Sequence, residues 1–193
     1  WRIELFEEHL NNTASQLPGV HIFLIDERIN KKEEFYYENG IKEYLEKKNS
    51  DQKGLTPILH FKETINGNVI EFAFQYLDQF FSEKFFSFAN TVFTSDEGTH
   101  VRGFRIGFNK AINDYAEEAN YIKKGGKIDP EDIKEGLTVV LSVMIKEQEL
   151  HFIGQTKGKL GTASIQNPVS NFVYDKVYYF LKENKGFAKS IMD

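Results

Sequence analysis

Residues 137–145 form the feature that most constrains the fold, because nearly all of them are apolar and many are β-branched. A short run of this composition is typical of a strand in the middle of a sheet. The chain has 193 residues, 40% of them hydrophobic, with 18 Phe and 9 Tyr, so it can bury a substantial core. We therefore predict one well-buried domain with a central strand over residues 137–145.

Five further strands are indicated by β-branched and aromatic runs. They are predicted over residues 20–26, 34–37, 58–62, 69–77 and 85–93. The first two are expected to pair across a turn at residues 30–32. The next two are expected to form a hairpin around Asn66-Gly67-Asn68, because Asn and Gly accept positive φ.

Helices are indicated by apolar residues that recur at helical spacing. They are predicted over residues 2–10, before a break at Pro18-Gly19, over 40–48, over 99–122, from Asp129-Pro130 onward, and from Pro168 onward. The apolar face of the 99–122 helix is expected to lie on the sheet. The predicted fold class is therefore α+β, a mixed sheet backed by two long helices.

The loop from Gly154 to Gly161 places an amide, a hydroxyl and an ammonium group side by side in Gln155-Thr156-Lys157. Glycines let backbone N–H groups approach an anion, and a lysine can reach a phosphate as a movable point charge. The pattern does not follow the Walker spacing, and most such loops taken alone are solvated turns. Lys159, in the same loop, is expected to be a solvated surface charge.

Several phrases in order give the chain a resemblance to a known family. It resembles the transducer domain of the bacterial type IIA DNA topoisomerases, the second domain of gyrase B-type subunits and their topoisomerase IV counterparts. The resemblance runs from about Phe6 to the C-terminus. The phrases are residues 35–41, Ala73-Phe74-Gln75-Tyr76, residues 88–105 with Gly98-Thr99-His100, Glu135-Gly136-Leu137-Thr138 and Gln155-Thr156-Lys157.

The resemblance implies a fold, a domain division and a role. The fold would be like ribosomal protein S-five domain 2, with a left-handed βαβ crossover. Residues 1–18 would link from a preceding ATPase domain of the GHKL class, and residues 19–193 would form the transducer, ending in a long helix toward the DNA-cleavage core. Lys157 would contact the ATP γ-phosphate and assist hydrolysis, with Gln155 as a second contact. ATP and Mg²⁺ would be bound mainly by that preceding domain, so the isolated chain is expected to be inactive.

Two arginines are the candidate contacts to nucleic acid. Arg102 and Arg105 share a helical face with Asn109 and Asn113, and the resemblance implies that Arg105 lines a cavity through which duplex DNA passes. The alternative is a solvated helix face paired with Asp114 and Glu117. The implied partners are double-stranded DNA, a second copy of the ATPase region and a gyrase A-type subunit in a heterotetramer.

The histidines show no compact metal-ligand spacing, so no metal site is predicted. His100 is expected to order its loop by hydrogen bonds. The family usually has two glycines before Thr-His, whereas this chain has Glu97-Gly98, which places a side chain where a hydrogen is common.

Charge and composition limit the remaining classes. A net charge of −5 and a pI near 5.6 argue against an autonomous, tight nucleic-acid binder. The absence of Cys, membrane spans and a signal-peptide layout favours a soluble, cytoplasmic protein. The chain begins at Trp1, and both ends are expected to continue into a longer polypeptide.

Three alternatives remain open. The chain could belong to a topoisomerase IV-type rather than a gyrase-type subunit. It could be a coupling module of the mismatch-repair or chaperone ATPases, although the Gln155-Thr156-Lys157 and Gly98-Thr99-His100 phrases argue against that. It could also be a free-standing binding domain with no ATP partner.

Overall fold

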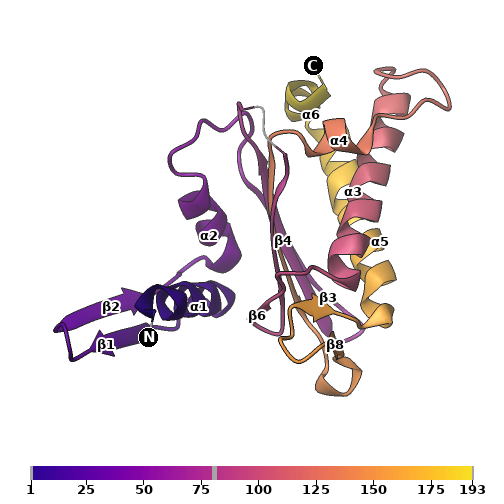
Figure 1. The fold of residues 1–193 in the computed structure, drawn as a ribbon. Helices are drawn as coiled ribbons and strands as arrows, with labels where there is room; N and C mark the ends of the chain where they lie inside the picture. The colour runs from indigo at the N-terminus through magenta and orange to yellow at the C-terminus, as the bar shows by residue number, and fades with distance from the viewer. Residues whose placement is uncertain (1, 80–81, 193) are drawn as a thin grey trace.

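A computed structural model describes residues 2–79 and 82–192. Its main sheet has five strands in the order β3-β4-β7-β5-β6 (Figure 1). Two small hairpins, β1-β2 and β8-β9, lie outside this sheet. The strands are β1 (Ile22–Asp26), β2 (Lys31–Phe35), β3 (Leu59–Ile65), β4 (Asn68–Tyr76), β5 (Lys84–Ala89), β6 (Val92–Phe93), β7 (Leu137–Met144), β8 (Phe152–Ile153) and β9 (Lys159–Leu160).

The helices lie on both sides of the main sheet (Figure 1). They are α1 (Ile3–Gln16), α2 (Gly40–Lys48), α3 (Thr99–Glu118), α4 (Pro130–Lys134), α5 (Gln166–Glu183) and α6 (Lys185–Met192), with short 3₁₀ turns at Glu147–Glu149 and Ala163–Ile165. The mixed α+β class is confirmed. Residues 1 and 193, the outer limits of the two expected segments, lie outside the described residues.

The predicted central strand is confirmed in β7. It pairs antiparallel with β4 and parallel with β5, and every residue from Leu137 to Val143 is buried. Val139 and Leu141 belong to the core between the sheet and the helices α3 and α5, whereas Val140 packs with Ala73 and Phe88 on the opposite face. Burial on both faces explains why the strand is apolar without alternation.

The two long helices, α3 and α5, cover one face of the sheet as predicted. Their close approach depends on two glycines one helical turn apart. A Cβ added at Gly103 would lie 2.4 Å from the carbonyl oxygen of Gln166, and one at Gly107 would lie 2.2 Å from that of Ser170. At these two points the backbone of α3 therefore lies directly against the backbone of α5.

The opposite face is covered by α2 and α1, a layer that the sequence did not predict as such. Tyr44 of α2 packs edge-on against Phe86 and Phe88 of β5. Its hydroxyl donates a 2.9 Å hydrogen bond to Asn12 of α1. The N-terminal helix is thereby joined to the rest of the fold, while the proposed domain boundary at residue 18 stays a prediction.

Several predicted elements differ from those observed. Residues 85–93 are two strands and not one, because Asn90 and Thr91 take left-handed φ values of 47° and 68° and turn the chain. The last long helix ends at Glu183, where the Asn184 side chain donates to the Phe180 carbonyl. The β1-β2 turn precedes Lys31 and does not span residues 30–32. The strands β5 and β7, which are connected through α3 and α4, are parallel as expected for a βαβ crossover. The left-handedness of this crossover stays a prediction.

His100, near the start of α3, is fully buried and orders its surroundings as predicted. Its Nε2 lies 3.2 Å from the Thr94 hydroxyl, which donates to the Ser87 carbonyl. Nδ1 is buried with no partner in the described structure. Burial therefore lowers the pKa of His100 from 6.5 to about 4, although the charge of Glu97 opposes that shift.

The helix contact generates the first prediction. Gly103→Ala or Gly107→Ala should lower the free energy of unfolding by about 1–3 kcal/mol, because the new methyl group overlaps a carbonyl oxygen of α5. Urea unfolding of the isolated chain measures this. Gly186→Ala in α6 is the control, since nothing lies within 4 Å of the point that its Cβ would occupy. Equal stability of all three variants would contradict the backbone contact.

His100 generates the second prediction. The unfolded chain binds a proton near pH 6.5 and the folded chain only near a pKa of about 4. Stability from neutral His100 is thus fully present above pH 6.5 and declines as the pH falls toward 4, by about 3 kcal/mol. Unfolding measured across this range should show a shallower pH slope in His100→Gln, whereas His151→Gln, which alters an exposed side chain, should keep the slope. An unchanged slope in His100→Gln would contradict the prediction.

Candidate functional site

The phosphate-contact candidates lie at the tip of the β8-β9 hairpin. Gln155, Thr156 and Lys157 are exposed there, between two short antiparallel strands. Figure 1 shows the hairpin at the end of the molecule opposite α6. The predicted Gly-punctuated loop is observed over residues 154–158, whereas Lys159 and Leu160, which were also predicted to lie in the loop, form β9.

The backbone and charge of this tip suit an anion. Gly154 and Lys157 take left-handed φ values of 81° and 54°, and the Lys157 N–H donates to the Gly154 carbonyl at 3.4 Å. Lys157 Nζ lies 6.0 Å from the Phe152 ring centroid. Within residues 2–79 and 82–192, neither Gln155 nor Lys157 has a side-chain hydrogen bond or an ion pair. An ammonium group without a carboxylate partner can accept a phosphate at little cost in lost contacts.

The hairpin is attached to the loop that begins α3. Asp96 N–H donates to the Gly158 carbonyl at 2.8 Å, and Leu160 N–H donates to the Glu97 carbonyl at 3.0 Å. A Cβ at Gly98 would lie 2.3 Å from the Leu160 carbonyl oxygen, so glycine is required at that close approach. The hairpin and the start of α3 thus share one hydrogen-bonded junction.

Arg105, the main candidate for DNA contact, is engaged by two carboxylates. Its Nη1 and Nη2 donate to both oxygens of Glu97 at 2.7 and 2.8 Å. Its Nε and Nη2 donate to Glu83 at 3.2 and 2.6 Å. The guanidinium also lies 5.2 Å from the Phe85 ring centroid. Burial by itself would lower the pKa of Arg105. The hydrogen bonds to Glu97 and Glu83 have the opposite and larger effect, so the pKa is raised above its ordinary value.

The alternative partners expected for this helix face were wrong. Asp114 accepts hydrogen bonds from Lys110 and Tyr174, not from an arginine. Glu117 accepts from the backbone N–H of Gly125. The sequence missed Glu83 altogether, because nothing in its local pattern signals a contact 22 residues away.

Glu97 occupies a backbone conformation that disfavours a side chain. Its φ is 61°, in the left-handed region, which costs a non-glycine residue on the order of 1–3 kcal/mol. Its hydrogen bonds to Arg105 lower the pKa of its carboxyl group. The only sequence signal for this residue was its place where the resembled family usually has glycine.

Arg102 and the two asparagines of the predicted face do not join Arg105. Arg102 is exposed. Asn113 donates to the Asn109 carbonyl at 2.8 Å and accepts from the Ile128 N–H at 2.8 Å, so it fixes the loop after α3. The structure therefore ties the Arg105 side chain to Glu97 in the loop that contacts the hairpin, whereas the Arg102 side chain is exposed.

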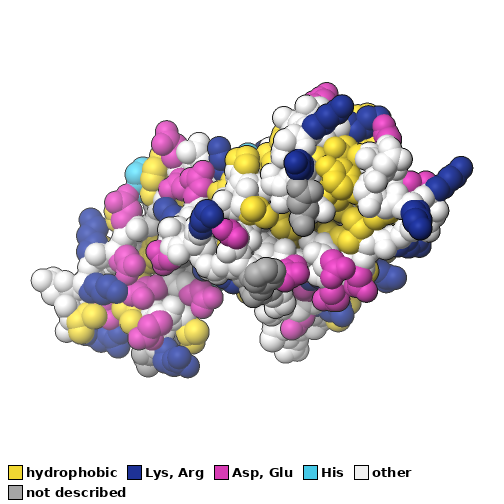
Figure 2. Space-filling model, turned by 90° about the horizontal axis from the view of Figure 1, so that it is seen from above, with side chains coloured by type: hydrophobic (Ala, Val, Ile, Leu, Met, Phe, Trp, Pro, Cys, Tyr) yellow, Lys and Arg dark blue, Asp and Glu magenta, His cyan; other side chains and the backbone are white. Residues whose placement is uncertain are grey.

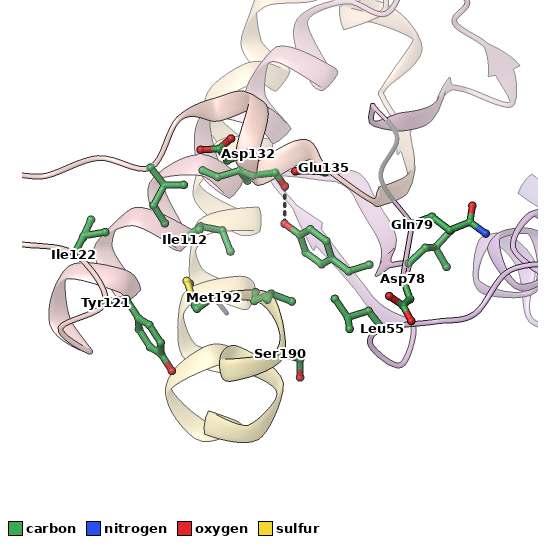
Figure 3. A pocket seen from close by; sticks show the side chains of 15 residues that line it. Leu55, Asp78, Gln79, Ile112, Tyr121, Ile122, Asp132, Glu135, Ser190 and Met192 are labelled. Atoms are coloured by element: carbon green, nitrogen blue, oxygen red, sulfur yellow. Dashed lines mark hydrogen bonds between the residues drawn. The ribbon is translucent and has the colours of Figure 1, made fainter.

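A separate cavity of about 490 Å³ lies at the other end of the molecule. Figure 3 shows Ile112, Tyr121 and Met192 facing into it, with Asp132 and Glu135 nearby. Figure 2 looks at this end from above and shows apolar side chains gathered in a hollow. None of the four predicted site residues lines this cavity. Gln155, Lys157 and Arg102 are exposed on the surface, whereas Arg105 is half-buried.

Neither a metal site nor a membrane-spanning helix occurs in the described part of the chain. No group of three or more His, Asp or Glu side chains there could hold a metal ion. No described helix is both long and apolar enough to cross a bilayer.

Comparisons with known proteins agree on one family. Residues 40–193 match the DNA gyrase B family. The chain is 39% identical to the B subunit of DNA topoisomerase 4 from Streptococcus pneumoniae serotype 4, over 100% of its length and 30% of that protein. It is also 39% identical to the corresponding protein of Bacillus subtilis, over 97% of its length and 29% of that protein. The chain thus spans about 30% of the length of these relatives.

Solved structures support the same relation. The 43K ATPase domain of Thermus thermophilus gyrase B matches 97% of this chain and 50% of its own, with a TM-score of 0.79 and 25% identity. The topoisomerase IV ATP-binding domain of Francisella tularensis matches 100% of this chain and 51% of its own, with a TM-score of 0.81 and 25% identity. The order of motifs, the hairpin geometry and these matches place the chain in the DNA gyrase B family.

Proposed function

We propose that this chain is the transducer domain of a gyrase B-type subunit, which couples ATP binding and hydrolysis to closure of a dimer gate and DNA strand passage. The observation that carries this proposal is the unpaired Lys157 at the tip of a hairpin that is hydrogen-bonded to the start of α3. A group that binds a phosphate at the tip is thereby in mechanical contact with the helical layer.

Lys157 supplies the chemistry at the nucleotide. Its ammonium group meets the γ-phosphate of ATP held by a preceding ATPase domain, and Gln155 donates a second contact from its amide. A preorganised cation stabilises the charge that develops on a transferring phosphoryl group, so Lys157 also assists hydrolysis. When the γ-phosphate leaves, Lys157 loses its counter-charge and the hairpin is released. The adenine pocket and the Mg²⁺ ligands belong to the preceding domain.

The partners follow from this role. The subunit dimerises through its ATPase region and assembles with a gyrase A-type subunit around double-stranded DNA. Arg105, with Arg102 as a weaker candidate, contacts the phosphates of the transported duplex transiently. A net charge of −5 fits weak contact, because tight binding would hold the DNA in place.

A topoisomerase IV-type subunit is the second candidate. The observation that favours it is that the two relatives at 39% identity are both named as DNA topoisomerase 4 proteins. Both candidates use the same coupling. Relaxation and decatenation assays of the reconstituted enzyme, with supercoiling as the gyrase-specific product, distinguish them.

Lys157 gives the third prediction. In the full-length subunit, Lys157→Ala should fold normally and lose most ATP turnover, on the order of 100-fold, because the transition-state charge loses its cation. Steady-state ATP hydrolysis measures this. Lys159→Ala is the matched control, since it removes an exposed lysine two residues away. Near-normal turnover in Lys157→Ala would remove the residue from this role.

Arg105 gives the fourth prediction. Arg105→Gln should reduce the stimulation of ATP turnover by linear duplex DNA and slow strand passage, while turnover without DNA changes little. The variant also leaves Glu83, whose side chain is 8% exposed, without its cation, so the melting temperature must be compared first. Unchanged stimulation and strand passage in a folded variant would exclude Arg105 as a DNA contact.

A further inference from the structure

We propose that Glu97 is a latch that occupies Arg105 and releases it to a DNA phosphate when the β8-β9 hairpin moves. This inference deepens the proposed function and rests on it. Glu97 is a positioning residue here: it acts through Arg105 and does not itself touch the nucleotide or the DNA.

The latch is a matched pair of planar groups. Glu97 accepts two parallel hydrogen bonds from the Arg105 guanidinium, at 2.7 and 2.8 Å. Such bidentate contact is also the geometry in which arginine binds a phosphate. A phosphate can therefore use the same two N–H groups only after Glu97 has left them.

While Glu97 is bound to Arg105, the charges of the cluster disfavour binding of a DNA phosphate. Arg105 carries one positive charge and faces two carboxylates, Glu83 and Glu97, so the cluster has a net charge of −1. Without Glu97 the remaining pair is neutral. Glu83 is 8% exposed, whereas Glu97 is 41% exposed and is therefore the more accessible of the two carboxylates to solvent and to an incoming anion. Removing Glu97 therefore removes both a competitor and a repulsion.

The backbone of Glu97 connects this latch to the hairpin. Its carbonyl accepts the Leu160 N–H of β9, and the preceding residue, Asp96, donates its N–H to the Gly158 carbonyl, one residue after Lys157. Gly98, the next residue, packs directly on Leu160. Because Asp96, Glu97 and Gly98 all contact the hairpin, a shift of the hairpin would move the backbone before and after Glu97.

The conformation of Glu97 makes it easy to dislodge. Its left-handed φ of 61° is unfavourable for a residue with a side chain, so the surrounding contacts must hold it there. Those contacts include the Leu160 N–H bond to its carbonyl, its own N–H bond to the Thr94 carbonyl at 3.0 Å and the side-chain bonds to Arg105. When Lys157 engages a phosphate and draws the hairpin away, the bond from Leu160 weakens and the strained residue can relax.

The test measures the affinity of the full-length subunit for linear duplex DNA, with and without a non-hydrolysable ATP analogue, over a range of salt concentrations. The unaltered subunit should bind DNA more tightly with the analogue. Glu97→Gln and Glu97→Gly should both bind several-fold more tightly without it and gain little from it. The slope of log affinity against log salt should steepen by about 0.9 per subunit, as for one added phosphate contact.

Two controls separate the latch from simpler causes. Glu63→Gln removes the same charge from a similarly exposed ion pair, with Lys176, and should leave DNA affinity unchanged. Glu97→Gln combined with Arg105→Gln should gain nothing over Arg105→Gln alone. An equal gain from Glu63→Gln, or a gain that persists without Arg105, would overturn the latch. So would a gain in Glu97→Gly but not in Glu97→Gln, because that pattern reports backbone relaxation only.

Parallel ATP hydrolysis by Lys157→Ala distinguishes the two levels of proposal. If Lys157→Ala loses turnover while Glu97→Gln binds DNA like Glu63→Gln, the latch is wrong and the proposed function stands. If Lys157→Ala keeps its turnover, the hairpin receives no nucleotide signal, and the proposed function fails together with the latch.

Discussion

The rest of the structure depends on the burial of β7 on both faces. Its residues alternate between two apolar layers, one shared with α3 and α5 and the other with α1 and α2. Hydrophobic burial of this extent is the main favourable term in folding. It also fixes the position of β5 beside β7, and so the point from which the chain leaves toward the Glu97 loop and α3. The position of the surface site on the hairpin and the Glu97 loop therefore depends on β7, a strand that is buried.

The elements that the sequence predicted well are those with a local cause. The apolar run of β7, the Asn66-Gly67 turn and the Asp129 cap of α4 each depend on neighbouring residues. The turn at Asn90-Thr91 was missed, because Thr rarely takes a left-handed φ. The contacts of Arg105 were missed for a different reason: Glu83 and Glu97 belong to separate segments, and only tertiary packing brings them to one guanidinium.

For the predicted site residues, too, the sequence indicated the residues themselves but not the partners that tertiary packing gives them. Motif order predicted Gln155 and Lys157 as site residues, and their exposure is compatible with residues that act on a partner. Arg105 was predicted from the same resemblance, yet its observed partners are two carboxylates. Glu97 illustrates the limit, since a departure from a glycine pattern can be noticed in a sequence, but the partner of the new side chain cannot.

The two glycines of α3 have a consequence for how far a displacement travels. Where side chains separate two helices, rotamer changes can absorb small movements, but Gly103 and Gly107 leave only main-chain atoms against α5. The pair should therefore respond as a single stiff lever about 30 Å long, the length of a 20-residue helix. A tilt of about 5° at the hairpin end would swing the α6 end by roughly 2.5 Å over that length. A displacement too small to break any packing contact at one end of the domain thus becomes a movement of atomic size at the other.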